Sequence, residues 1–90
     1  MGLTSKTAAR IEEMKEKLLK DNIHVRRVDK VEGKRLLLLD YKGQGLYSAW
    51  FFSPETGFGD FVYSSTWQNF KTFRKTALSF AAKRAKLARM

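Results

Sequence analysis

The residues best suited to a chemical task are basic side chains at helical spacing near the C-terminus. Residues 61–90 carry seven Lys or Arg and no Asp or Glu, so they hold most of the formal net charge of +9. A helix face of a single sign repels itself, whereas an ordinary solvated face mixes both signs. The pattern therefore predicts a surface that binds a polyanion. Projected at 100° per residue, the cations on one side of this expected helix are Lys71, Lys75, Lys83, Lys86 and Arg89.

A second basic cluster surrounds an expected β-hairpin, where Asp29 and Glu32 are the only acids in ten positions. A basic hairpin can clamp a nucleic-acid backbone. Charges on an outer strand also prevent edge-to-edge aggregation. Both interpretations stay open at this point. The residues that we select as further phosphate contacts are Arg26, Arg27, Lys34 and Arg35.

Aromatic residues are concentrated in the middle of the chain, with seven of the twelve between Tyr41 and Phe61. Strand alternation places apolar side chains on both faces of the expected sheet, and Leu37 and Leu39 need burial. Exposed rings could stack on unpaired bases, each contributing about 1–3 kcal/mol, or form a dimer or partner interface. Alternatively, the helices cover both faces and bury every ring. The candidates for stacking or an interface are Tyr41, Tyr47 and Phe51.

Catalytic chemistry has weak support in the sequence. His24 is the only histidine, and the absence of Cys excludes a thiolate metal site and a disulfide framework. Glu32-Gly33-Lys34 has the acid–x–Lys spacing of a large class of nucleases, but it lies where a hairpin turn is expected. We therefore expect no enzymatic activity, no metal site and no cofactor.

The elements that must position these residues are expected in the order α-β-β-β-β-α. Thr4-Ser5 can cap a first helix that runs to about Lys20, and Asp21-Asn22 suits its exit. A change from helical to alternating periodicity then predicts strands, the first with a bulge at Arg26-Arg27 and a turn at Glu32-Gly33 after it. Further turns are expected at 42–45 and 53–57. The expected strands cover 23–31, 35–41, 46–52 and 58–64.

The last helix is expected to begin after a cap at Ser65 or Thr66. Its apolar arc should cover the sheet. We predict an α+β fold, with one small domain over residues 1–90, an antiparallel meander sheet and two packed helices. Whether residues 1–6 are ordered is left open. The predicted apolar arc consists of Trp67, Phe70, Phe73, Ala77, Leu78, Phe80, Ala81, Ala85 and Leu87.

The element order is similar to that of double-stranded RNA-binding domains. Those domains carry paired lysines at the start of their last helix. Here residues 64–69 contain no basic residue, and the first basic residue after them is Lys71. The hairpin from Trp50 to Asp60, with the helix after it, also resembles part of the integrase arm-type DNA-binding domains. Neither likeness assigns residue roles, so no family is assigned.

The sequence as a whole favours a small intracellular, cytoplasmic nucleic-acid-binding protein. No apolar run approaches the roughly 20 residues of a membrane span, and the N-terminus does not read as a signal peptide. We expect phosphate contacts with little sequence readout, to DNA slightly in preference to RNA. The alternative is a protein-interaction module, a dimeric adaptor or inhibitor whose basic face meets an acidic partner. An anionic membrane surface ranks lower, because the aromatic residues of the last helix are needed to close a small core.

Overall fold

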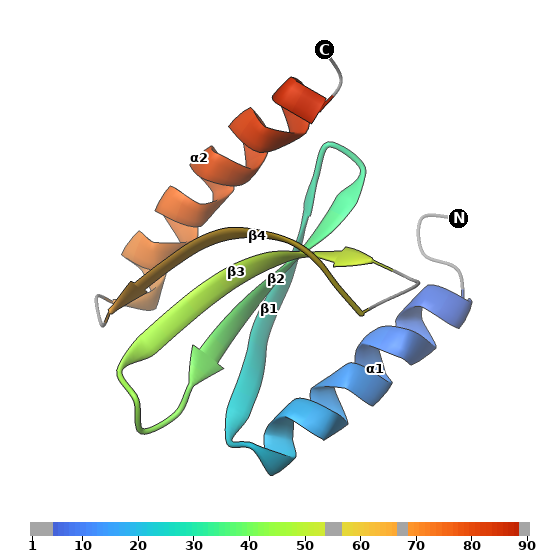
Figure 1. Cartoon of the computed structure of the whole chain (residues 1–90), viewed down its shortest axis with the longest axis vertical. Coiled ribbons are helices and arrows are strands. Elements are labelled where there is room, and N and C mark those ends of the chain that lie inside the picture. The colour runs from blue at the N-terminus through green and yellow to red at the C-terminus, as the bar shows by residue number, and fades with distance from the viewer. Residues whose placement is uncertain (1–4, 54–56, 67–68, 89–90) are drawn as a thin grey trace.

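Four strands pair in chain order between two helices in the computed structural model, which describes residues 5–53, 57–66 and 69–88 (Figure 1). The sheet is antiparallel with the order β1-β2-β3-β4. The predicted α+β fold, with an open meander sheet and a helix before and after it, is confirmed. The elements are α1 (Ser5–Lys20), β1 (Ile23–Val31), β2 (Lys34–Tyr41), β3 (Leu46–Ser53), β4 (Gly57–Thr66) and α2 (Phe70–Ala88).

Local backbone geometry follows the turn residues in the first half of the chain. Asn22 follows the end of α1 and has a φ of 61°, in the left-handed region that Asn tolerates. Glu32 and Gly33 both have positive φ, at 50° and 82°, as a two-residue hairpin turn requires. The register of β1 against β2 shifts between Val25 and Arg27. The predicted helix exit, hairpin turn and bulge are therefore confirmed.

The start of α2 differs from the prediction. β4 continues to Thr66, because Ser65 and Thr66 still pair with β3. Asn69 is the cap instead: its Oδ1 accepts a hydrogen bond from the backbone N–H of Thr72 at 2.8 Å. The prediction of a cap at Ser65 or Thr66 was wrong because four good capping residues lie between positions 64 and 69, and cross-strand pairing keeps the first three of them in β4. Trp67 lies outside the described residues.

The two helices cover opposite faces of the sheet, as Figure 1 shows. Met14 of α1 packs with Leu37 and Leu39 on one face. On the other face α2 packs on side chains that alternate with those two along β2. The molecule thus has three layers, with one core on each side of the sheet. The second core contains Val31, Leu36, Leu38, Tyr47, Ala49, Phe51, Phe73, Ala77, Ala81 and Ala85.

This arrangement accounts for the aromatic and leucine residues that suggested an exposed sheet face. The rings of Tyr47 and Phe51 are 7% and 5% exposed beneath α2, so neither offers a surface for stacking or for an interface, which corrects that expectation. Leu37 and Leu39 are buried on the α1 side and need no second copy to cover them. Tyr41 is half-buried, and its hydroxyl accepts a hydrogen bond from Ser48 Oγ at 3.0 Å.

The buried stripe of α2 is narrower than predicted. Alanines at 77, 81 and 85 are buried against the sheet, and their small side chains let the helix backbone approach it. Phe80 and Leu87, both expected in the core, remain 44% and 70% exposed. The prediction for these two was wrong because an arc half the helix circumference in width exceeds what a four-stranded sheet covers. No helix among the described residues is long and apolar enough to cross a membrane.

Gly59 allows β4 to approach β3 closely. A Cβ at this position would lie 2.9 Å from the backbone oxygen of Phe51, where the register of the two strands shifts. Gly59→Ala should therefore lower the free energy of unfolding by about 1–3 kcal/mol, as overpacking does elsewhere. Urea unfolding measures this, with the exposed Ser64→Ala of the same strand as control. Equal stability of the two variants would show that the β4 backbone shifts at this point without cost, which would contradict the close approach.

Candidate nucleic-acid interface

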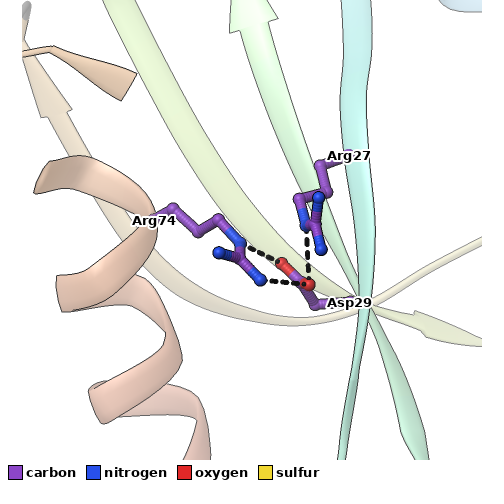
Figure 2. A network of polar contacts seen from close by, with 3 residues as sticks. All are labelled: Arg27, Asp29 and Arg74. Carbon is purple, nitrogen blue, oxygen red and sulfur yellow. Dashed lines mark hydrogen bonds and ion pairs between the residues drawn. The ribbon is translucent and has the colours of Figure 1, made fainter. Parts of the chain in front are cut away.

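A buried carboxylate on β1 holds two arginines from different elements. Asp29 is only 8% exposed. Arg74 of α2 donates to both of its oxygens, from Nε at 3.0 Å and from Nη2 at 2.9 Å. Arg27 of β1 donates from Nε to Oδ1 at 2.8 Å. Figure 2 shows the two guanidinium groups converging on this carboxylate from the helix and the strand.

A second buried carboxylate, on β2, also pairs with two cations, at longer distances. Asp40 is 4% exposed, and its Oδ2 lies 3.3 Å from Nζ of Lys42 and 3.7 Å from Nη1 of Arg26. Arg26 also donates to the hydroxyl of Tyr47 at 3.2 Å. Its guanidinium carbon lies 4.2 Å from the ring centroid of Phe70, within cation–π range. Arg26 is thereby fixed against the first turn of α2.

The β-bulge explains how adjacent arginines reach the same side of the sheet. In a regular strand Arg26 and Arg27 would point to opposite faces. The shift of register leaves Arg26 as the extra residue, and its contacts to Tyr47 and Phe70 place it on the α2 side. Arg27 and Asp29 are two residues apart in the strand, so their side chains share this face.

The exposed charge of this region is positive. Both carboxylates are buried, whereas the side chains of Arg26, Arg27 and Arg74 are 47%, 51% and 36% exposed. Each guanidinium has five N–H donors in a planar fork, and the contacts with Asp29 and Asp40 engage only some of them. The arrangement thus presents fixed cations with donors that remain available to a ligand.

The exposed lysines of α2 extend this positive surface along the helix. Lys71 and Lys75 are both exposed, and at 100° per residue they lie 60° and 100° from Arg74 on the same flank. None of the ion pairs found among the described residues involves either lysine. We call this set the basic cluster; it comprises Arg26, Arg27, Lys71, Arg74 and Lys75.

The remaining predicted contacts lie elsewhere. Lys83 lines a groove on the β4 side of α2, and Lys86 is exposed between that groove and the basic cluster. Lys34 lies at the hairpin with Nζ 5.5 Å from the ring centroid of Phe51. Arg35 lines a pocket with Ile11 of α1, toward the opposite side of the sheet. Arg89 lies outside the described residues.

Sequence reasoning missed Arg74 and Lys42 as members of this region. Arg74 falls toward the apolar arc of α2, where a cation requires a buried acid as its partner. Asp29, set among the bases of β1, was the available signal. The contact spans 45 positions of sequence. Only the fold reveals that pairing.

The arginines lower the pKa of Asp29 below its ordinary value of 3.8. The hydrogen bonds from Arg74 contribute most, Arg27 adds to them, and burial opposes both. A depressed pKa stabilises the fold above the unfolded-state pKa near 4, and this contribution is lost as the pH falls through the folded-state value.

We therefore expect acid to destabilise the wild type more than Asp29→Asn. Neutral Asn gives up the charge-assisted bonds at every pH, so its stability should depend less on pH below about pH 4. The urea midpoint measured from pH 7 down to pH 2 tests this, with the exposed Asp60→Asn as control. Parallel curves for wild type and Asp29→Asn would contradict the ion-pair geometry.

Neither a metal-ligand cluster among the described residues nor a related protein identifies a ligand for this site. In residues 5–53, 57–66 and 69–88, no three His, Cys, Asp or Glu gather as a metal site would require. The chain matches no protein-family model, no curated protein and no solved structure.

Proposed function

We propose that this protein binds the phosphate backbone of nucleic acid through the basic cluster. The observation that carries the proposal is the pairing of two cations with each of two buried carboxylates, Asp29 and Asp40. A purely structural ion pair needs one cation for each acid. Here the additional cations remain half-exposed on the same face as the exposed lysines of α2.

The carboxylates position the cations before a ligand arrives. Free arginine side chains lose conformational entropy when they bind, at a cost of about 0.5–1.5 kcal/mol each. Arg26, Arg27 and Arg74 are already held by Asp40, Tyr47 and Asp29, so less of this cost remains. The buried negative charges also reduce repulsion among the arginines. A guanidinium fork suits phosphate oxygens, with which it forms bidentate hydrogen bonds.

The site favours contacts to the backbone over readout of bases. Phosphate contacts position a protein on nucleic acid but carry no sequence information. Tyr47 and Phe51 are buried, which leaves no stacking platform at these positions. We therefore expect weak sequence preference, with DNA retained as the first choice of ligand and RNA as the second.

A salt series on three ligands tests the proposal. Length-matched single-stranded DNA, duplex DNA and duplex RNA are titrated with the protein. If all five cations of the basic cluster neutralise phosphates, the slope of log K against log salt should be about −4.5 on duplex DNA and about −3.5 on a single strand. Undetectable binding to all three ligands at low salt would contradict the proposed function.

A further inference from the structure

The β4 side of α2 carries a groove with a composition different from that of the basic cluster. Apolar side chains from the helix and the strand line it together with charged groups. On α2, Phe80 and Leu87 lie within 20° of each other around the helix axis, two turns apart. The residues of this β4 groove are Asp60, Val62, Phe80, Lys83, Arg84 and Leu87.

Two of these apolar side chains are among the four large hydrophobic residues that are exposed in the described part of the chain. Phe80 is 44% and Leu87 70% exposed, whereas the alanines on the inner face of α2 are buried. Phe80 is fixed by the ring of Tyr63, with centroids 5.1 Å apart, and Nζ of Lys83 lies 5.9 Å from its centroid. The groove therefore presents an ordered sequence of apolar, basic and apolar groups along the helix.

The strand beside the groove is at the edge of the sheet. β4 pairs only with β3, and no described strand pairs with its outer edge. α2 contacts β4 on this side, and Phe80, Lys83 and Leu87 lie on the helix flank that lines a groove with Asp60 and Val62 of the strand. A further strand added to β4 would place alternate side chains against that flank.

We infer that the β4 groove binds an extended acidic segment of a partner protein, which adds to the sheet beside β4. Lys83 and Arg84 outnumber Asp60 in the groove, so an acidic side chain complements it. Phe80 and Leu87 are about 10 Å apart along the helix, and residues i and i+4 of a strand are about 13 Å apart. The fitting pattern is apolar–x–acid–x–apolar.

This inference does not depend on nucleic-acid binding, because the β4 groove shares no residue with the basic cluster. The probe is the peptide Leu-Ser-Glu-Ser-Leu-Ser-Glu-Ser-Leu, followed by amide NMR. We expect shifts at β4 and around Phe80 and Leu87. The same peptide with Lys in place of Glu should bind at least about tenfold more weakly, because like charges then meet. Equal binding of both peptides, or shifts confined to other elements, would overturn the inference.

Two variants with the same substitution make the test specific. Leu87→Ser should abolish the shifts while the thermal midpoint stays unchanged, because this side chain is 70% exposed. Leu19→Ser on α1, where the leucine is 51% exposed, should leave peptide binding intact. Lys71→Gln/Lys75→Gln should also retain it. Peptide binding that survives Leu87→Ser overturns the inference.

Sedimentation velocity tests whether a second copy of this chain, in place of an acidic partner, occupies the β4 groove. A dimer that Leu87→Ser dissociates would assign the β4 groove to self-association and overturn the proposal of an acidic partner. A monomer at all concentrations supports it. Loss of duplex DNA binding in Leu87→Ser would instead assign the groove to nucleic acid, which also overturns it.

Discussion

Removing two exposed lysines from the basic cluster should weaken nucleic-acid binding about 100-fold at about 50 mM salt, because each phosphate contact contributes about tenfold there. The variant is Lys71→Gln/Lys75→Gln. Its slope of log K against log salt should become less negative by about 1.8 on duplex DNA. Both side chains are exposed and outside the ion pairs found among the described residues, so the thermal midpoint should change little.

A matched control separates this site from net charge alone. Lys17→Gln/Lys20→Gln removes the same charge from α1, on the opposite side of the sheet. Its affinity should fall far less, because those lysines do not adjoin the basic cluster. Equal losses in the two double variants would mean that binding follows overall charge, and the assignment to α2 and β1 would then be wrong.

Phe73→Ala should reduce the free energy of unfolding by about 3–5 kcal/mol, the range for deleting a buried aromatic ring. Phe73 is fully buried and packs against the rings of Tyr47 and Tyr63, with centroids 5.0 Å and 5.6 Å away. Its loss leaves a cavity in the core between α2 and the sheet. A domain of this size has a total stability of only about 5–15 kcal/mol, so the variant should lose a large fraction of its stability.

Chemical denaturation followed by tryptophan fluorescence and circular dichroism measures this loss. Phe80→Ala is the matched control on the same helix, where the ring is 44% exposed, and it should cost clearly less. Equal losses in the free energy of unfolding at the two positions would mean that α2 does not pack on the sheet through Phe73. The assignment of the inner and outer faces of α2 would then have to be reversed or abandoned.

Local rules were sufficient to predict the elements of this fold. The change of period at Ile23, the Glu32-Gly33 turn and the left-handed exit at Asn22 are all properties of neighbouring residues, and the structure confirms them. The cap of α2 was not predictable in the same way. Residues 64–66 have the composition of a turn and a cap, but pairing with β3 keeps them in the strand and moves the cap to Asn69.

The layer arrangement required information that periodicity does not contain. Alternation along β2 and β3 showed that both faces of the sheet are apolar, but not whether a helix or a second copy covers each face. The structure places one helix on each face, which buries Tyr47 and Phe51. The width of the α2 stripe was overestimated for a related reason, since sequence does not tell how much of a helix a curved sheet covers.

The candidate site was partly visible in the sequence. The excess of basic residues in β1 and α2 is evident from the sequence. The exposure of Lys71 and Lys75 in the structure agrees with it. The division of the basic residues between two flanks of α2 could not be read, because it depends on where β1 and β4 lie. The contact of Arg74 with Asp29 joins residues far apart in sequence and determines which cations form one cluster.

Amide and arginine side-chain NMR with a short DNA duplex tests the central claim most directly, because it locates the contact on the molecule. We expect the largest shifts at the guanidinium N–H groups of Arg26, Arg27 and Arg74 that are not donated to Asp29 or Tyr47, and at the amides around Lys71 and Lys75. Rising salt should reverse these shifts. Shifts concentrated on α1, or on the β4 groove with an unperturbed basic cluster, would contradict the account.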